Sequence, residues 1–151
     1  MTSEPYKIAA RALALFDAKF NCAEAVATAL TEYFAPLPTC FPKVATCFGG
    51  GLGRRGETCG ALVGALLAVS AVRGREPGEG DEAKKRCYAL AEQVVESFRE
   101  GLGPLSCREL LGIDLATPEG ARAFAASDYH HTHCHRIVAA AARLAAEVLA
   151  A

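Results

Sequence analysis

The sequence has no tryptophan, a single methionine and no excess of basic residues, and each absence narrows what the chain can be. Sixteen Lys and Arg against 17 Asp and Glu give a net charge of −1, so the charge excess typical of nucleic-acid binding is missing. No basic face points to a membrane surface either. We therefore expect neither nucleic acid nor a membrane as a partner.

Long apolar runs and targeting signals are missing as well. The longest apolar run, Ala61 to Val72, contains Gly64 and Ser70 and is well short of the roughly 18 residues that indicate a membrane span. The first residues, Met1 to Pro5, lack the basic start and the apolar stretch of a signal peptide. These features predict a cytoplasmic protein, in a compartment where structural disulfides are uncommon.

Alanine, in contrast, is abundant, with 31 of the 151 positions. An alanine-rich chain with only 7% aromatic residues favours close-packed helices over sheets. The apolar fraction of 52% and the charged fraction of 22% exclude a disordered chain. The length predicts one domain over residues 1–151, with a homodimer as the alternative to a monomer.

Apolar residues recur at helical spacing over most of the chain. The exceptions are a Pro-rich loop, a glycine run and a second loop, at 36–42, 49–53 and 74–80. Glycines end several of the expected helices, and Thr117-Pro118 begins another. We expect helices over 5–19, 21–34, 58–73, 81–101 and 106–112, from 117, and from 128 or 132 to the C-terminus. The predicted fold is an all-α, single-domain helical bundle of about six to seven helices with a glycine-rich loop.

The seven cysteines are the main chemical question, because no two of them form a C-x-x-C pair. The spacings of zinc ribbons, ferredoxins and haem-attachment sites are therefore excluded. Four cysteines instead lie at expected helix starts, each after a capping residue type. These are Cys22 after Asn21, Cys59 after Thr58, Cys107 after Ser106 and Cys134 two residues after Thr132.

A helix start can activate a thiol. It offers unpaired backbone N–H groups and the positive end of the helix dipole, which both stabilise a thiolate. Asn21 with Glu24 and Ser106 with Glu109 each fit a capping box. A thiolate attacks disulfides, binds soft metals or ligates iron–sulfur clusters. The alternative is that these cysteines are small hydrophobic residues that pack well near helix ends.

The other three cysteines have weaker contexts. Cys87 lies in the middle of the helix expected over 81–101, on its apolar stripe, and is predicted to be a core residue. Cys40 lies in the Pro-rich loop and Cys47 precedes the glycine run, so each is either a surface residue or a peripheral ligand.

All four histidines fall between His130 and His135, around Cys134. On a helix, His130 and Cys134 share a face, and this i, i+4 spacing is typical of metal ligands. We predict that at least one of these histidines lies beside the helix-start cysteines, to complete a metal site or, when protonated, to stabilise a thiolate. The alternative is that all four point into solvent.

The segment from Gly51 to Gly56 matches the string G-x-G-x-x-G, but no strand precedes it, so dinucleotide binding is not expected. A tight loop here is expected to bring Cys59 close to the other helix-start cysteines. Arg54 and Arg55 are expected to make the local electrostatic potential more positive. Glycines at 60 and 64, four residues apart, allow close approach between helices.

Four parts of the sequence form a pattern together: Phe20 to Val26, the block from Phe48 to Gly64 that contains CGALVG, Ser106 to Gly112, and the isolated Cys134 before an apolar helix. This pattern resembles the C-GCAxxG-C-C family of putative redox-active proteins. The resemblance covers nearly the whole chain, and the glycine-rich block is its most specific part.

The resemblance implies electron or thiol redox chemistry, with an iron–sulfur cluster suspected for relatives. The signature cysteines that it implies are Cys22, Cys59, Cys107 and Cys134. This chain departs from the pattern by its additional cysteines and by the histidines around Cys134, which leave the number of ligands open.

Three functions follow as hypotheses. In the first, the four signature cysteines, with His130 as a further ligand, hold an iron–sulfur cluster, or zinc or another metal, and exchange electrons with an unknown redox partner protein. In the second, the protein is a metal-free thiol/disulfide oxidoreductase in which Cys22 or Cys59 is the catalytic thiolate. In the third, it is a helical interaction module with structural cysteines. Whether the protein is an enzyme depends on which hypothesis holds.

Overall fold

The computed structural model describes residues 3–151, so Met1 and Thr2 of the N-terminal stretch considered above lie outside the described residues. The regular structure of the described part is helical, without a β-strand, and confirms the all-α class. No helix between residues 3 and 151 is long and apolar enough to cross a bilayer. The α-helices are α1 (Glu4–Asp17), α2 (Cys22–Phe34), α3 (Gly49–Leu52), α4 (Gly60–Arg73), α5 (Asp81–Leu102), α6 (Cys107–Leu111), α7 (Pro118–Ala126) and α8 (His135–Ala150).

The number of α-helices in residues 3–151 is eight, which corrects the expected six to seven. The additional helix is α3, within the glycine run that was predicted as a loop. Gly50 and Gly51 have φ angles of 67° and 74°, so the chain coils here through the left-handed region that glycine adopts without strain. Two further turns are helical, the 3-10 helix η1 (Lys43–Phe48) and the π-helix η2 (His130–Cys134).

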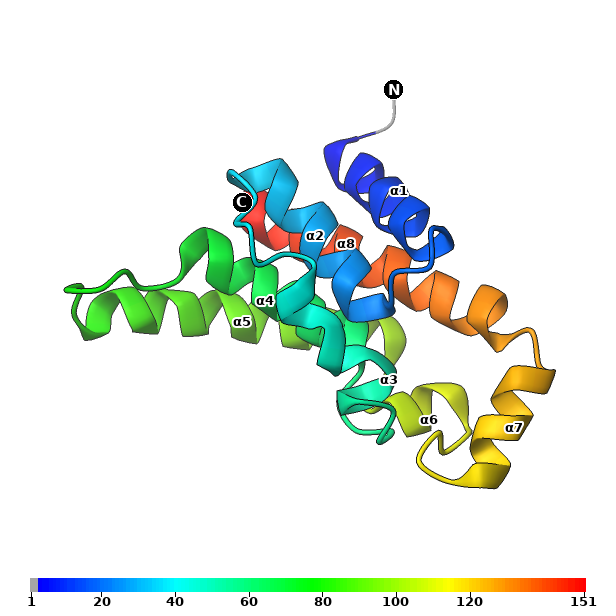
Figure 1. Cartoon of the computed structure of the whole chain (residues 1–151). Helices are drawn as coiled ribbons and strands as arrows, with labels where there is room; N and C mark the ends of the chain where they lie inside the picture. The colour runs from blue at the N-terminus through cyan, green and yellow to red at the C-terminus, as the bar shows by residue number, and fades with distance from the viewer. Residues whose placement is uncertain (1–2) are drawn as a thin grey trace.

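Helix α2 lies between its neighbours and packs against α1, α4 and α8 (Figure 1). Ala25 and Ala29 of α2 are buried together with Val26 and Leu30, and four alanines of α8 are buried in the same core: Ala141, Ala142, Ala145 and Ala146. Helix α1 also packs against α8, while α5 covers α4 and α8. Small side chains let these helices approach closely, and a few large side chains such as Phe98 fill the remaining space.

The contact between α2 and α4 is especially tight because Gly64 faces Ala23. A Cβ atom added to Gly64 would lie 2.5 Å from the carbonyl oxygen of Ala23 and 3.1 Å from its Cα. These are backbone atoms of a buried helix, so they cannot move aside as a flexible side chain can. Glycine at position 64 therefore sets the distance between the two helices.

The starts of α2, α4, α6 and α8 gather at one end of the molecule, beside α3 (Figure 1). An isolated antiparallel bridge joins the segments that lead into α4 and α6. In it, the N–H of Cys59 donates to the Leu105 carbonyl at 2.8 Å, and the N–H of Cys107 donates to the Glu57 carbonyl at 2.7 Å. Backbone pairing thus holds two of the signature cysteines next to each other.

The Gly64 contact predicts a measurable cost for one added methyl group. Gly64→Ala should lower the free energy of unfolding by about 1–3 kcal/mol, because it overpacks the α2–α4 contact. Gly101→Ala is the matched control: its Cβ would meet Leu144 Cδ1 at an ordinary 3.5 Å, and alanine stabilises a helix by about 0.5–1 kcal/mol relative to glycine. Urea titrations followed by circular dichroism measure both. Equal stabilities for the two variants would contradict the close α2–α4 contact.

Candidate functional site

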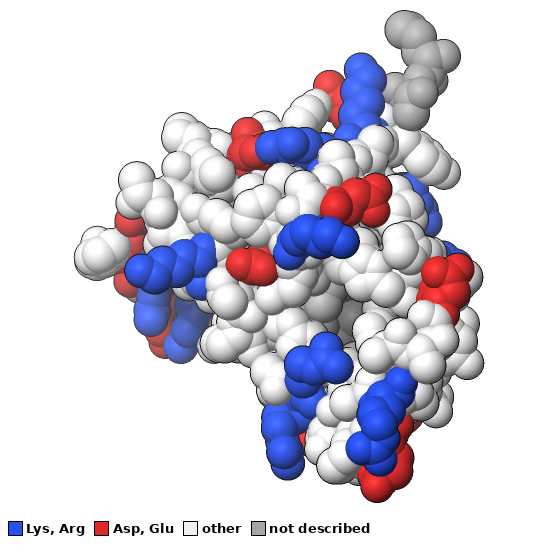
Figure 2. All heavy atoms as spheres, turned by 45° about the vertical axis from the view of Figure 1, so that its right-hand side comes forward, with Lys and Arg blue, Asp and Glu red and all other residues white. Residues whose placement is uncertain are grey.

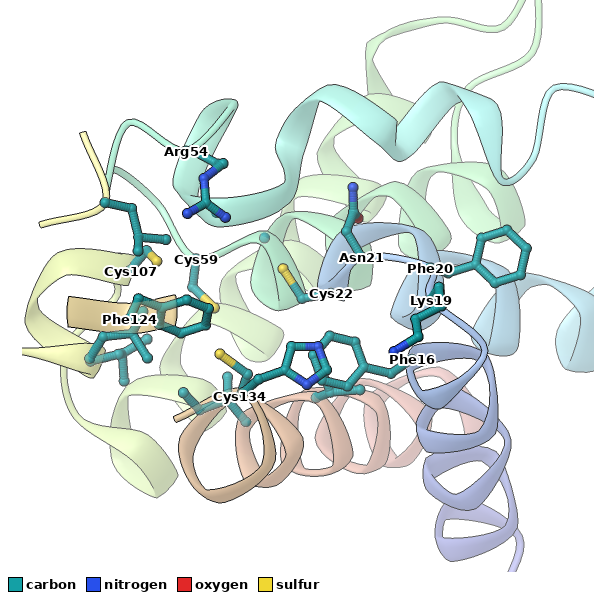
Figure 3. A pocket seen from close by; sticks show the side chains of 18 residues that line it. Phe16, Lys19, Phe20, Asn21, Cys22, Arg54, Cys59, Cys107, Phe124 and Cys134 are labelled. Carbon is teal, nitrogen blue, oxygen red and sulfur yellow. The ribbon is translucent and has the colours of Figure 1, made fainter. Parts of the chain in front are cut away.

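The four signature cysteines line one cavity of about 280 Å³ at the end of the molecule where the helix starts gather. Figure 3 shows their sulfur atoms around a common space, each carried by a different segment of the chain. Most of the remaining wall is apolar and comes from α1, α6, α7 and α8. The apolar side chains that line it are Phe16, Phe20, Leu110, Leu111, Leu115, Phe124, Ile137 and Val138.

Cys22 is the first residue of α2, directly after the N-cap Asn21. The N–H of Glu24 donates to Asn21 Oδ1 at 2.9 Å, and the N–H of Asn21 donates to Glu24 Oε1 at 2.9 Å, which completes the predicted capping box. The sulfur of Cys22 lies over Gly60, where a Cβ would come within 2.5 Å of it. Glycine at position 60 therefore makes room for the Cys22 thiol at the start of α4.

Cys59 is the N-cap of α4 and not its first helical residue. The prediction that Thr58 caps this helix is wrong, because Thr58 pairs with Ser106 in the isolated bridge. The Cys59 thiol is buried, and the N–H groups of Ala61 and Leu62 act on it in the direction that lowers its pKa. The N–H of Ala61 acts in the same way on the pKa of Cys22, so one donor serves both thiols.

Cys107 begins α6, and its N-cap Ser106 accepts a hydrogen bond from the N–H of Glu109 at 3.1 Å. This is one half of the predicted capping box; the Glu109 side chain does not return the bond to the N–H of Ser106. Cys134 differs from the other three. It lies at the end of the π-helix η2, and its φ and ψ of −64° and −40° continue directly into α8. The expectation that Cys134 has the unpaired N–H groups of a helix start is therefore wrong, because helical turns precede it.

Burial decides the protonation of these thiols and corrects the expectation that their positions stabilise thiolates. Burial raises the pKa of Cys22 and of Cys59, raises the pKa of Cys107 to about 11 and raises the pKa of Cys134 to about 12. The backbone N–H groups at the helix starts lower the pKa of Cys22 and Cys59, but by less than burial raises it. With nothing bound, the four thiols are neutral at pH 7.

The four thiols are also coupled to one another. A negative charge on Cys22 raises the pKa of Cys59, Cys107 and Cys134, so Cys22 lies within electrostatic reach of each of them. Arg54 acts in the opposite direction and lowers the pKa of Cys107. Ionising several of these thiols together near pH 7 therefore requires positive charge inside the cavity.

His130 lines the same cavity as the signature cysteines. Its ring stacks on Phe16 with a centroid distance of 4.2 Å and an interplanar angle of 13°. Burial lowers the pKa of His130, so it is neutral at pH 7. The other histidines have partners elsewhere: His131 at Asp128, His133 at Tyr129 and His135 at Asp17.

The remaining cysteines lie away from the cavity. Cys40 and Cys47 are exposed, before and within η1. Cys87 packs against the core from α5, as predicted, but it is half-buried and not fully enclosed. All seven cysteines are free thiols in the structure.

The described residues, 3–151, contain no group of three or more His, Cys, Asp or Glu side chains close enough to hold a metal ion. A tetrahedral zinc site, with Zn–S bonds of about 2.3 Å, needs sulfur atoms roughly 4 Å apart. The signature cysteines line a cavity, but they are not grouped closely enough to be the ligands of one ion. The arrangement leaves room for a group larger than one ion.

Part of the cavity wall was missed by sequence reasoning. Phe16 and Lys19, from the end of α1, and Phe124, from α7, line the cavity but belong to no recognisable motif. The sequence could have indicated Phe20 as a lining residue, because Phe20 directly precedes the Asn21-Cys22 pair at the start of α2.

The family model described as "Putative redox-active protein (C_GCAxxG_C_C)" matches residues 20–148. The chain belongs to this family. The matched segment contains all four cysteines of the cavity, and the family description names a redox-active role. Comparisons of this C_GCAxxG_C_C protein with curated proteins and with solved structures found no match.

The raised pKa values predict that the reduced protein loses stability as the pH rises above 9. Unfolded thiols ionise near pH 9, whereas folded Cys107 and Cys134 keep their protons up to about pH 11 and 12. The folded state then binds more protons than the unfolded state, so the free energy of unfolding falls, by up to about 1.4 kcal/mol per pH unit and thiol.

Urea titrations between pH 7 and 11 in the presence of a reductant measure this slope. Cys134→Ala should make the slope shallower, while Cys40→Ala, at an exposed position, should leave it unchanged. A Cys134→Ala slope as steep as that of the wild type would show that the Cys134 thiol ionises as freely in the folded state as in the unfolded one.

Proposed function

We propose that this C_GCAxxG_C_C protein transfers electrons through an iron–sulfur cluster held by Cys22, Cys59, Cys107 and Cys134. The observation that carries the proposal is that four thiols from four separate segments line one cavity. Four cysteine thiolates are the usual ligand set of [2Fe–2S] and [4Fe–4S] clusters. Zinc or another soft metal is the alternative occupant of the same cysteines.

The dimensions of the cavity favour a polynuclear group over a single ion. Its volume of about 280 Å³ is far larger than the roughly 10–15 Å³ that one water molecule requires. The cysteines do not close around one point, as a single zinc ion requires. A cluster contains inorganic sulfide as well as iron, so it can join cysteines that lie farther apart than the ligands of a single zinc ion.

The protonation of the thiols is compatible with this role. Burial keeps them neutral. The positive charge of bound iron would allow them to ionise, so binding would release protons and would strengthen as the pH rises. His130, neutral and in the same cavity as Cys134, can act as a further ligand. When bound, the cluster supplies one-electron chemistry, and the apolar wall limits its contact with water.

Anaerobic reconstitution with ferrous iron and sulfide tests the proposal. The wild type should take up about two or four iron ions per chain and show sulfur-to-iron charge-transfer absorption. Serine at Cys22, Cys59, Cys107 or Cys134 should remove most of the bound iron. Serine at Cys40, Cys47 or Cys87 is the matched control, because these cysteines lie outside the cavity, and should leave iron uptake unchanged.

Two outcomes would count against the cluster. A wild type that binds zinc but no cluster would identify the alternative occupant. Equal iron loss in Cys87→Ser and Cys59→Ser would show that the cavity is not the binding site.

A metal-free thiol/disulfide oxidoreductase is the second candidate function, and the proximity of Cys22 to the start of α4 supports it. The Cys22 sulfur lies over Gly60, the neighbour of Cys59, and the Ala61 N–H acts on both thiols. One thiolate would attack a substrate disulfide, forming a mixed disulfide and releasing one thiol. The second cysteine would then displace the other substrate thiol and close a Cys22–Cys59 disulfide. The raised pKa of both thiols makes the attacking thiolate scarce, which favours the first candidate.

Thiol counting separates the two candidates. A redox-active pair should leave five of the seven cysteines free after equilibration with oxidised glutathione, with full recovery on reduction. Peptide mapping should then find Cys22 joined to Cys59. A metal site should instead protect four thiols until a chelator is added. If all seven thiols stay free under oxidising conditions and no metal is taken up, the remaining hypothesis is the helical interaction module with structural cysteines.

A further inference from the structure

We propose that the cavity also receives a small organic anion with a flat apolar body, whose negative group is bound by Lys19 and Arg54. The identification of this anion as the substrate of the redox site rests on the proposed function, whereas its binding does not. The two cations are exposed, and Cys59 and Cys107 are buried. The cations therefore lie at the mouth of the cavity, and these two thiols lie at its floor.

The charge of the cavity wall has one sign. Of the 18 residues that line it, Lys19 and Arg54 carry a formal charge, and no Asp or Glu lines it. Neither cation takes part in an ion pair among residues 3–151. Figure 2 shows a hollow on this side of the molecule, with Lys and Arg side chains above and below it. The wall is thus complementary to a negatively charged molecule.

Both cations occupy backbone conformations that favour glycine, with φ angles of 80° at Lys19 and 64° at Arg54. Lys19 closes α1 in a Schellman-type turn, in which its N–H donates to the Phe16 carbonyl at 3.1 Å and the Phe20 N–H donates to the Leu15 carbonyl at 3.2 Å. Glycine is the usual residue at such a position because it carries no Cβ penalty. The chain instead places a long cation at each strained position on the rim, and such strain concentrates at functional sites.

The Arg54 side chain is directed into the cavity. Figure 3 shows its guanidinium turned toward the space between Cys107 and Cys59. Its Cζ lies 6.0 Å from the centre of the Phe124 ring. Gly50 leaves a path for this side chain, because a Cβ there would lie 2.8 Å from Arg54 Cγ.

The apolar part of the wall defines the body of the anion. Phe16, Phe20 and Phe124 line the cavity, and the His130 ring, which stacks on Phe16, lines it as well. Aromatic rings pack favourably against flat apolar groups. A largely apolar pocket with a few polar or charged groups in its wall is typical of small-molecule sites. The volume of about 280 Å³ restricts the occupant to a small molecule.

Two fluorescent probes with the same ring system test the proposal. 1-Anilinonaphthalene-8-sulfonate is an aromatic anion, and N-phenyl-1-naphthylamine lacks the sulfonate. Each is titrated into the full chain, reduced and without metal. The sulfonate should bind more tightly than the neutral probe and should slow alkylation of Cys134 relative to Cys87. Lys19→Gly and Arg54→Gly should each weaken sulfonate binding about fivefold, as expected for one exposed charge contact, and leave binding of the neutral probe unchanged.

The chain provides two matched controls. Leu52→Gly changes another non-glycine residue with a positive φ, 64°, two positions before Arg54 but outside the cavity wall. Arg55→Gln removes the neighbouring cation, which does not line the cavity. Both should keep the wild-type affinity for the sulfonate. Glycine relieves backbone strain at all three positive-φ positions, so thermal unfolding should show folded proteins throughout.

Equal affinity of the wild type for the two probes would overturn the proposal. The proposal would also be overturned if Leu52→Gly or Arg55→Gln weakened sulfonate binding as much as Lys19→Gly and Arg54→Gly do. Alkylation of Cys134 at the same rate with and without the sulfonate would overturn it as well. Because the protein carries no metal in this test, a negative result does not affect iron uptake by the cysteines. A failure of iron uptake likewise leaves the probe result standing, so the two proposals fail independently.

Discussion

The tight contact between α2 and α4 is the constraint on which the rest of the structure depends. Gly64 brings α4 against the backbone of α2 at Ala23, and Gly60, one turn earlier, accommodates the Cys22 thiol. The two glycines thus fix both the helix spacing and the position of the first signature cysteine beside the second. The antiparallel bridge then adds Cys107 to this pair through backbone hydrogen bonds. Only Cys134 is placed by packing of its own helical segment.

The chemistry of the cavity depends on the balance between burial and backbone dipoles. A helix start stabilises a thiolate when water also solvates the charge, but an apolar wall excludes that water and so disfavours the thiolate. At Cys59 both effects act, and burial is the larger. Consequently the thiols are kept protonated until a positive charge enters, and this property suits a metal-binding site better than a freely reactive nucleophile.

Much of the fold was predictable from local sequence. The alanine content and the capping box at Asn21 predicted helices and the start of α2, because these signals act within a few residues. The glycine run was predicted as a loop, since nothing local reveals that Gly50 and Gly51 coil through the left-handed region. The chain segments that carry the signature cysteines could also be identified. The aromatic wall from α1 and α7, and the sign of the pKa shifts, could not, because both depend on which distant segments bury a residue.

The position of Cys134 beside α8 has a consequence for the assembly of the cavity. Cys134 comes immediately before α8, and α8 packs against α1, α2, α4 and α5. The four thiols therefore line one cavity only after α8 has docked on these helices. Proteins whose contacts join residues far apart in the sequence fold more slowly than proteins rich in local contacts. A chain cut before α8 therefore lacks the packing that places Cys134 and cannot present a complete four-thiol cavity.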